Sequence, residues 1–328
     1  MRYIALEEAF SAPGAAQFVA PGSNQRRPRN AGPARFNMDV VQEYKRKLPD
    51  FAEYRIPEMD KYGIDIQVLS LTAPGVQAEA DPRAAVENAV NANDFLAEII
   101  AQYPTRFRGF AALPMQDPQV AAGELRRCVE ELGFCGALVN DHTQGHYLDE
   151  PQYEVFWSAL ESVGRPLYIH PGSVPLDDWH VKRGYPQMTG AGWSWGAETG
   201  GHALRLVYGG VFDRHPDATV ILGHMGEFLP FQRSRLDSRY RTLEFDHPLE
   251  RKPSEYIGTN IVLTNSGVFS PATLKGAVME VGADAVMFSV DYPYESTAEA
   301  VEGFERTELS DIDRAKIAYQ NAERILKL

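Results

Sequence analysis

The chain has 328 residues, of which 44% are hydrophobic and 23% charged, so it is long enough to form one large α/β domain. Its formal net charge of −13 argues against a nucleic-acid partner and against binding to an anionic membrane surface. No apolar stretch approaches the roughly 18 residues of a membrane span, and the short apolar start runs into two glutamates, unlike a signal peptide.

The two cysteines provide neither a disulfide framework nor a repeated metal-binding spacing. Cys128 falls on the apolar face of a predicted helix and Cys135 lies in a predicted strand, so we expect both to be buried thiols. This cysteine usage and the missing signal peptide predict a cytoplasmic protein.

Short apolar runs alternate with amphipathic segments about eight times along the chain. Strands are predicted over residues 2–6, 64–71, 107–112, 134–139, 166–169, 219–223, 260–264 and 285–290. The clearest helices are predicted over 39–62 with a break near Leu48, from Pro82 to Tyr103, from Pro118 to a stop at Gly133, over 153–160 and over 311–326. The last helix is expected to bury Ile312, Ala315, Ala318, Ala322 and Ile325.

This alternation, with no change of composition that would mark a linker, predicts a single (β/α)8 TIM barrel domain over residues 1–328. Two long loop insertions are expected, after strands 1 and 5. The first, over 11–37, is either a cap on the site or a mobile loop, and the second, over 172–196, lies where a lid would be. The tryptophans of the second loop either line a pocket or pin the loop down.

Polar side chains follow several of the predicted strands. Glu7 follows the first strand, His170 the fifth, His224 the sixth and Asp291 the eighth. The carboxyl ends of parallel barrel strands meet on one face, where active sites lie. Glu7, His170 and Asp291 would form an O/N/O set suited to a divalent ion with open positions, and Glu227 is placed to bind the His224 imidazole. One such residue is ordinarily structural, but four at separate strand ends predict an active site.

Six segments of the chain carry a resemblance to a known family. They cover residues 5–10, 69–77, 136–140, 168–171, 222–227 and 288–293. These segments resemble the amidohydrolase-related decarboxylases that act on hydroxybenzoates, the family of the γ-resorcylate and 2,3-dihydroxybenzoate decarboxylases. The resemblance implies a homodimer or homotetramer that acts on a small aromatic acid.

The resemblance implies that Glu7, His170 and Asp291 bind one divalent metal ion. Many relatives have a histidine ligand where this chain has Ala9, which leaves Mg²⁺ or Mn²⁺ as plausible as Zn²⁺. The family's arginine two residues after the histidine is replaced here by Gly172, and loops of this kind select the substrate.

The resemblance also implies the reaction: non-oxidative decarboxylation of ortho-hydroxylated aromatic acids such as dihydroxybenzoates. Asp291 would protonate the ring carbon, and the hydrogen-bonded pair His224 and Glu227 would lie beside the substrate. The substrate-binding residues that it implies are Arg235, often supplied by the neighbouring subunit, Ala73 and Asn140.

Two other functions remain open at this point. One is a metal-dependent hydrolase of the same superfamily, such as a lactonase, with Asp291 as the base. Those enzymes usually pair two histidines after the first strand, where this chain has Glu7, Glu8 and Ala9. The other is a barrel that binds an aromatic acid without turning it over.

Overall fold

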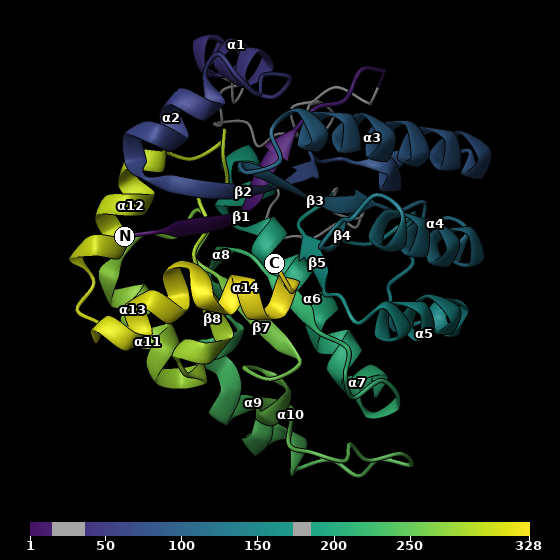
Figure 1. Ribbon diagram of the computed structural model, residues 1–328. Coiled ribbons are helices and arrows are strands. Elements are labelled where there is room, and N and C mark those ends of the chain that lie inside the picture. The colour runs from purple at the N-terminus through teal and green to yellow at the C-terminus, as the bar shows by residue number, and fades with distance from the viewer. Residues whose placement is uncertain (15–36, 173–184) are drawn as a thin grey trace.

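The computed structural model describes residues 1–14, 37–172 and 185–328, apart from the side chain of residue 186. Eight parallel strands follow one another around a nearly closed barrel in the order of the sequence, with helices outside them (Figure 1). The strands are β1 (Tyr3–Phe10), β2 (Ile64–Leu71), β3 (Phe107–Ala112), β4 (Gly136–Asn140), β5 (Leu167–His170), β6 (Val220–Leu222), β7 (Ile261–Thr264) and β8 (Val286–Met287). The predicted (β/α)8 fold is confirmed.

Several helices begin at a capping aspartate or end at a glycine, as the sequence predicts. The Asp81 side chain accepts a hydrogen bond from the Arg83 amide at the start of the helix that begins at Pro82, and Asp117 accepts from two amides at the start of the helix that begins at Pro118. Gly63 ends α2 in the left-handed conformation. The helices before β6 are α1 (Met38–Lys47), α2 (Arg55–Tyr62), α3 (Pro82–Gln102), α4 (Pro118–Glu130), α5 (Glu154–Val163), α6 (Ser194–Tyr208) and α7 (Val211–Arg214).

The second half of the chain is cut into shorter helices. They are α8 (His224–Glu227), α9 (Arg233–Tyr240), α10 (Pro253–Tyr256), α11 (Pro271–Val281), α12 (Thr297–Arg306), α13 (Asp311–Ala315) and α14 (Asn321–Leu326). A π-helical turn, η8 (Lys316–Gln320), separates the last two. The prediction that Ile312 is buried is wrong: its side chain is 70% exposed and Ile317 is buried instead. The wide turn changes which positions face the barrel.

The apolar core has two layers, because side chains of a strand alternate between the two faces of the sheet. The inner layer fills the barrel with residues such as Ile66, Phe110 and Tyr168, and the larger outer layer lies between strands and helices. Cys128 and Cys135 are both buried and unpaired, as predicted.

A β-bulge in β1 interrupts this alternation. Ala5 pairs with Gln67, but Glu8 pairs with Leu69, so β1 holds one residue more than β2 over this stretch. The amides of Leu6 and Glu7 both donate to the Ser289 hydroxyl, at 3.2 and 2.7 Å. As a result the Glu7 side chain points into the barrel, and Glu8 points outward to the Gln67 side chain.

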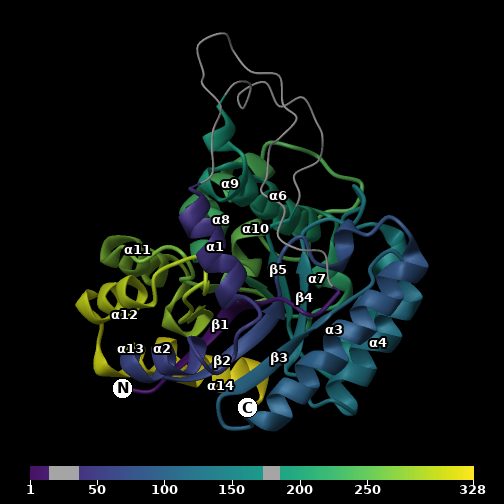
Figure 2. The same cartoon turned by 90° about the horizontal axis from the view of Figure 1, so that it is seen from above.

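The two ends of the chain lie at the amino ends of the strands. The Arg2 guanidinium donates to the Glu323 carboxylate beside the start of β1. Figure 2 shows both termini on one side of the barrel and helices α6, α8 and α9 on the other. Among the described residues, no helix is both long and apolar enough to cross a bilayer.

Candidate active site

Glu7, His170 and His224 converge at the carboxyl end of the barrel. One ligand atom from each lies within 4.8 Å of the other two. The Glu7 Oε1 atom is 3.3 Å from His170 Nε2 and 3.1 Å from His224 Nε2. These residues come from β1, the end of β5 and the turn after β6, so the predicted meeting of strand ends is observed.

Glu7 is held by hydroxyl groups on one side only. Its Oε2 atom accepts hydrogen bonds from the Tyr168 and Ser266 hydroxyls. A side chain at Gly223 would meet this carboxylate, since an added Cβ would lie 2.3 Å from Oε2. Burial raises the pKa of Glu7, but the neighbouring His224 and His170 and the Ser266 bond lower it to about 2. The carboxylate is therefore ionised.

Both histidines direct Nε2 toward Glu7, and in His170 this nitrogen is the unprotonated one. The His170 Nδ1 atom lies 2.7 Å from the Pro171 carbonyl, which only accepts, so we assign the proton to Nδ1. The His224 Nδ1 atom lies 2.6 Å from Glu227 Oε1, which confirms the predicted contact. Burial lowers the pKa of His170, whereas Glu7 and Glu227 outweigh burial and raise the pKa of His224 well above its ordinary value.

Asp291 lies beside this group, four residues beyond the end of β8. Its Oδ2 atom is 3.8 Å from His224 Nε2. Its backbone φ of 78° lies in the left-handed region, which is uncommon for a residue other than glycine and is typical of functional sites. Burial first, and then the Glu7 charge, raise the pKa of Asp291 to about 7, so this carboxyl is able to carry a proton near neutral pH.

The donor atoms of this group fit a divalent cation. Glu7 Oε1 is a buried carboxylate oxygen without a hydrogen-bond partner among the described residues, although two imidazole nitrogens lie within 3.3 Å of it. A cation between these three atoms would satisfy the oxygen and the His170 lone pair, and would bind His224 by displacing the proton from its Nε2 atom. The prediction placed Asp291 in the ligand set and His224 outside it, whereas the most compact group contains His224.

The remaining predicted site residues lie at different distances from the group. Asn140 is buried at the end of β4, with Oδ1 3.1 Å from His170 Nδ1. Ala73 is half-buried in the loop after β2, and Arg235 is exposed on α9. For Ala73, Asn140 and Arg235, contact with a substrate stays a prediction.

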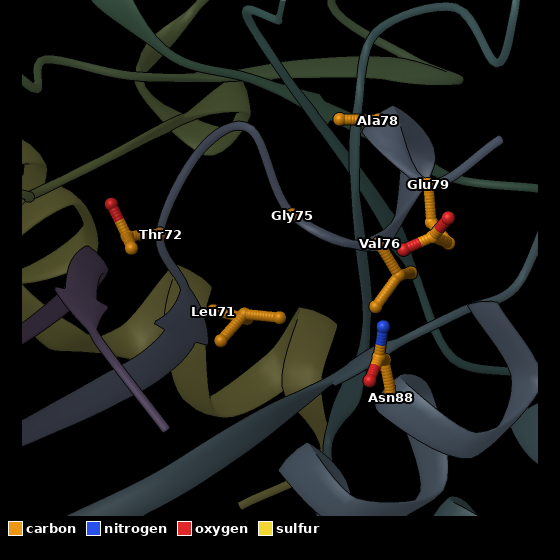
Figure 3. Close-up of a pocket in the computed structure, with 7 residues that line it drawn as sticks. All are labelled: Leu71, Thr72, Gly75, Val76, Ala78, Glu79 and Asn88. Carbon is orange, nitrogen blue, oxygen red and sulfur yellow. The ribbon is translucent and has the colours of Figure 1, made fainter. Parts of the chain in front are cut away.

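A pocket lies under the loop that follows β2 (Figure 3). Its walls are Leu71, Thr72, Gly75, Val76, Ala78, Glu79 and Asn88. None of the converging residues lines this pocket. It adjoins the site through Gly75, whose added Cβ would lie 2.2 Å from Asn140 Nδ2. The pocket therefore belongs to the rim of the barrel mouth.

Both predicted insertions lie partly outside the described residues, at 15–36 and 173–184, which includes Trp179. Two tryptophans of the second insertion are described. The Trp195 ring lies 6.4 Å from the His170 ring, as expected for a pocket wall. The Trp193 ring lies 5.4 Å from Phe228, as expected for a residue that pins a loop.

The sequence analysis missed the hydroxyl groups that hold Glu7. Tyr168 lies between two outward-facing residues on β5. The alternation of side chains along a strand could therefore have predicted that Tyr168 faces the barrel interior. Ser266 lies two residues beyond the end of β7, and the sequence analysis gave it no role. Nothing local indicated Ser289, because its function depends on the bulge in β1.

Comparisons with known proteins agree with this geometry. The amidohydrolase family model matches residues 18–328. The γ-resorcylate decarboxylase of Polaromonas sp. (strain JS666) is 46% identical over 87% of this chain and 90% of its own length.

Two solved structures are similar over nearly their whole length. A 2,6-dihydroxybenzoate decarboxylase complexed with 2,6-dihydroxybenzoate has a TM-score of 0.89 and 41% identity, covering 99% of both chains. A dihydroxybenzoic acid decarboxylase from Polaromonas sp. JS666, with bound manganese and the inhibitor 2-nitroresorcinol, has a TM-score of 0.89 and 42% identity, covering 99% of this chain and 97% of its own.

Proposed function

We propose that this chain, which belongs to the amidohydrolase family, is a divalent-metal-dependent decarboxylase of ortho-hydroxylated aromatic acids such as dihydroxybenzoates. The observation that carries the proposal is the buried, unpartnered Glu7 Oε1 atom facing two imidazole nitrogens. Relatives of known activity point the same way, since the similar structures were solved with manganese or with 2,6-dihydroxybenzoate.

Glu7, His170 and Asp291 would hold the ion. When bound there, a divalent ion such as Mn²⁺ polarises a phenolic oxygen and fixes the position of the ring. Tyr168 and Ser266 turn the Glu7 carboxylate so that Oε1 stays free for this purpose. Asn140 and the Pro171 carbonyl keep the His170 proton on Nδ1, away from the site.

Asp291 is the proposed general acid. Burial raises the pKa of its carboxyl to about 7 in the metal-free protein. This carboxyl would donate a proton to the ring carbon that bears the carboxylate. A C–H bond forms there, the bond to the carboxylate carbon breaks, CO₂ leaves, and the bonding electrons restore the aromatic ring. His224 would contact the substrate carboxylate or phenolate, with its orientation fixed by Glu227.

The test is CO₂ release from a panel of ortho-hydroxybenzoates, including 2,6- and 2,3-dihydroxybenzoate, by protein loaded with Mn²⁺. We expect turnover of at least one such acid and none of 4-hydroxybenzoate, which lacks the ortho hydroxyl. Bound metal with no CO₂ from any acid would overturn the proposal. If the protein hydrolysed a lactone and released no CO₂ from these acids, it would be a hydrolase of the same superfamily instead.

We propose further that the enzyme is a cytoplasmic homo-oligomer in which Arg235 enters the neighbouring subunit's site. Support comes from the exposed position of Arg235 on α9 and from exposed aromatic side chains near this helix, including Phe231 and Phe245. Mixing inactive Asp291→Asn with inactive Arg235→Ala subunits should restore activity. A protein that is monomeric by light scattering while active would contradict this assembly.

A further inference from the structure

The barrel closes differently between β8 and β1 than between any other neighbouring strands. Continuous pairing joins each strand from β1 to β8 to the next, but no ladder joins the two residues of β8 to β1. Near the site, one backbone hydrogen bond crosses this junction, from the Ala9 amide to the Tyr292 carbonyl at 2.7 Å. Glu7 and Asp291 lie on opposite sides of the junction, so other contacts must fix their spacing.

The Glu8 side chain makes such contacts. Its Oε1 atom accepts from the Val290 amide at 3.0 Å and from the Ser289 hydroxyl at 3.2 Å. Glu8 is fully buried, directly follows Glu7 on β1, and binds the residue directly before Asp291. The same Ser289 hydroxyl accepts the amides of the bulge that turns Glu7 inward.

Gln67 and Arg55 extend this hydrogen-bond network on the side of Glu8 that faces away from the site. Gln67 donates from Nε2 to Glu8 Oε2 at 3.1 Å and accepts from Arg55 at 3.1 Å. The Arg55 guanidinium also donates to the Ala9 carbonyl at 2.5 Å and lies 4.4 Å from the centre of the Tyr292 ring. Arg55 thus contacts chain segments on both sides of the junction, and both Arg55 and Gln67 are buried.

We propose that Glu8, Gln67 and Arg55, the junction network, are positioning residues that set the distance between Glu7 and Asp291 for metal binding. None of the three touches the site itself. The proposal rests on the metal site of the proposed function. Residues that orient metal ligands from behind typically contribute about 10- to 100-fold to metal affinity or activity.

The direction of the hydrogen bonds allows an exchange test. In Glu8→Gln, the new amide NH₂ faces the NH₂ of Gln67, and turning the Gln67 amide would set its NH₂ against Arg55. Adding Gln67→Glu restores an acceptor toward both neighbours and keeps one buried carboxyl beside Arg55. The double variant should therefore recover what Glu8→Gln loses.

The measurement is the Mn²⁺ dissociation constant of the folded protein, from the electron paramagnetic resonance signal of free Mn²⁺, with kcat alongside. We expect Glu8→Gln to weaken Mn²⁺ binding about 10- to 100-fold, to change the spectrum of the bound ion, and to lower kcat. The exchanged double variant should return to within about threefold of the parent.

The matched control is Glu124→Gln, in a buried network with Asn93 and Arg127 between α3 and α4. This variant should lower the unfolding temperature and leave Mn²⁺ affinity within twofold. A merely structural role for Glu8 would give the same result as the control.

The outcomes separate this proposal from the proposed function. If the parent protein binds no Mn²⁺, the metal site itself fails. If the parent binds and Glu8→Gln binds equally well, or if the exchange restores nothing, the junction network has no positioning role. Should Glu8→Gln not fold, Ser289→Ala decides: affinity equal to the parent's overturns the proposal, and a tenfold loss supports it.

Discussion

Asp291 combines three properties that few carboxyl groups share. It is largely buried, it lies near an imidazole, and its backbone adopts a left-handed conformation. Burial raises the free energy of the ionised carboxyl and the left-handed backbone raises that of the folded protein, whereas the His224 imidazole favours the ionised form. A carboxyl with a pKa of about 7 is the product of this arrangement.

Replacing Asp291 by Asn keeps the size of the side chain and removes its acidic proton. We expect decarboxylation to fall by more than about 10²- to 10⁴-fold, because a general acid contributes about that much and the metal is disturbed as well. The measurement is kcat from CO₂ release, with metal content by elemental analysis. Glu295→Gln, a carboxyl four residues further on, should stay within a few-fold of the parent, and near-normal turnover by metal-loaded Asp291→Asn would contradict the assignment.

At the scale of elements, the turn after β6 and the bulge in β1 fit one another. Gly223 leaves room for the Glu7 carboxylate and the Tyr168 hydroxyl, and the bulge brings Glu7 into that space. Both features are needed to orient Glu7. Without the bulge, a regular β1 would turn this side chain out of the barrel, whatever room Gly223 leaves.

Gly223→Ala tests this fit. The added Cβ would lie 2.3 Å from Glu7 Oε2 and 2.9 Å from the Tyr168 hydroxyl, so the carboxylate must move. We expect a loss of about 1–3 kcal/mol in the free energy of unfolding, typical of overpacking, and at least tenfold weaker Mn²⁺ binding. Denaturant unfolding and metal titration provide the two numbers.

The control for this substitution is Gly123→Ala on α4, where an added Cβ meets nothing within 4 Å. It should raise the free energy of unfolding by about 0.5–1 kcal/mol, because alanine favours a helix more than glycine does. If Gly223→Ala behaved like Gly123→Ala, the fit between turn and bulge would be wrong.

The sequence predicted most elements well and the bulge not at all. β2 and β3 have the predicted bounds, because apolar runs between clear helix stops leave little freedom. Two adjacent glutamates satisfy either register of β1, and the choice depends on Ser289, far away along the chain. The sequence therefore placed Glu7 correctly near the site but offered no local signal for how it is turned inward.

At the scale of the whole molecule, the candidate metal group joins distant parts of the chain. The three proposed ligands, Glu7, His170 and Asp291, belong to β1, the end of β5 and the loop after β8. An ion bound to all three would link segments that separate on unfolding, and a ligand that binds only the folded state stabilises it by mass action. The prediction of one domain over the full length of the chain stays a prediction.

Removing the metal should therefore lower the unfolding temperature. At free Mn²⁺ a hundred times its dissociation constant, the folded state gains about 2.7 kcal/mol relative to the chelated protein. Calorimetry with Mn²⁺ and with a chelator measures the difference. The shift should vanish in Glu7→Gln, and equal unfolding temperatures for the parent under both conditions would count against the site.

The contact between Arg2 and Glu323 places both chain ends at the base of the barrel, opposite the site (Figure 2). A purification tag or a fused partner at either end would therefore lie on the face of the barrel opposite the site. An enzyme immobilised on a solid support through either end would turn the carboxyl ends of its strands toward the liquid, so a packed column of this protein should keep its catalytic capacity.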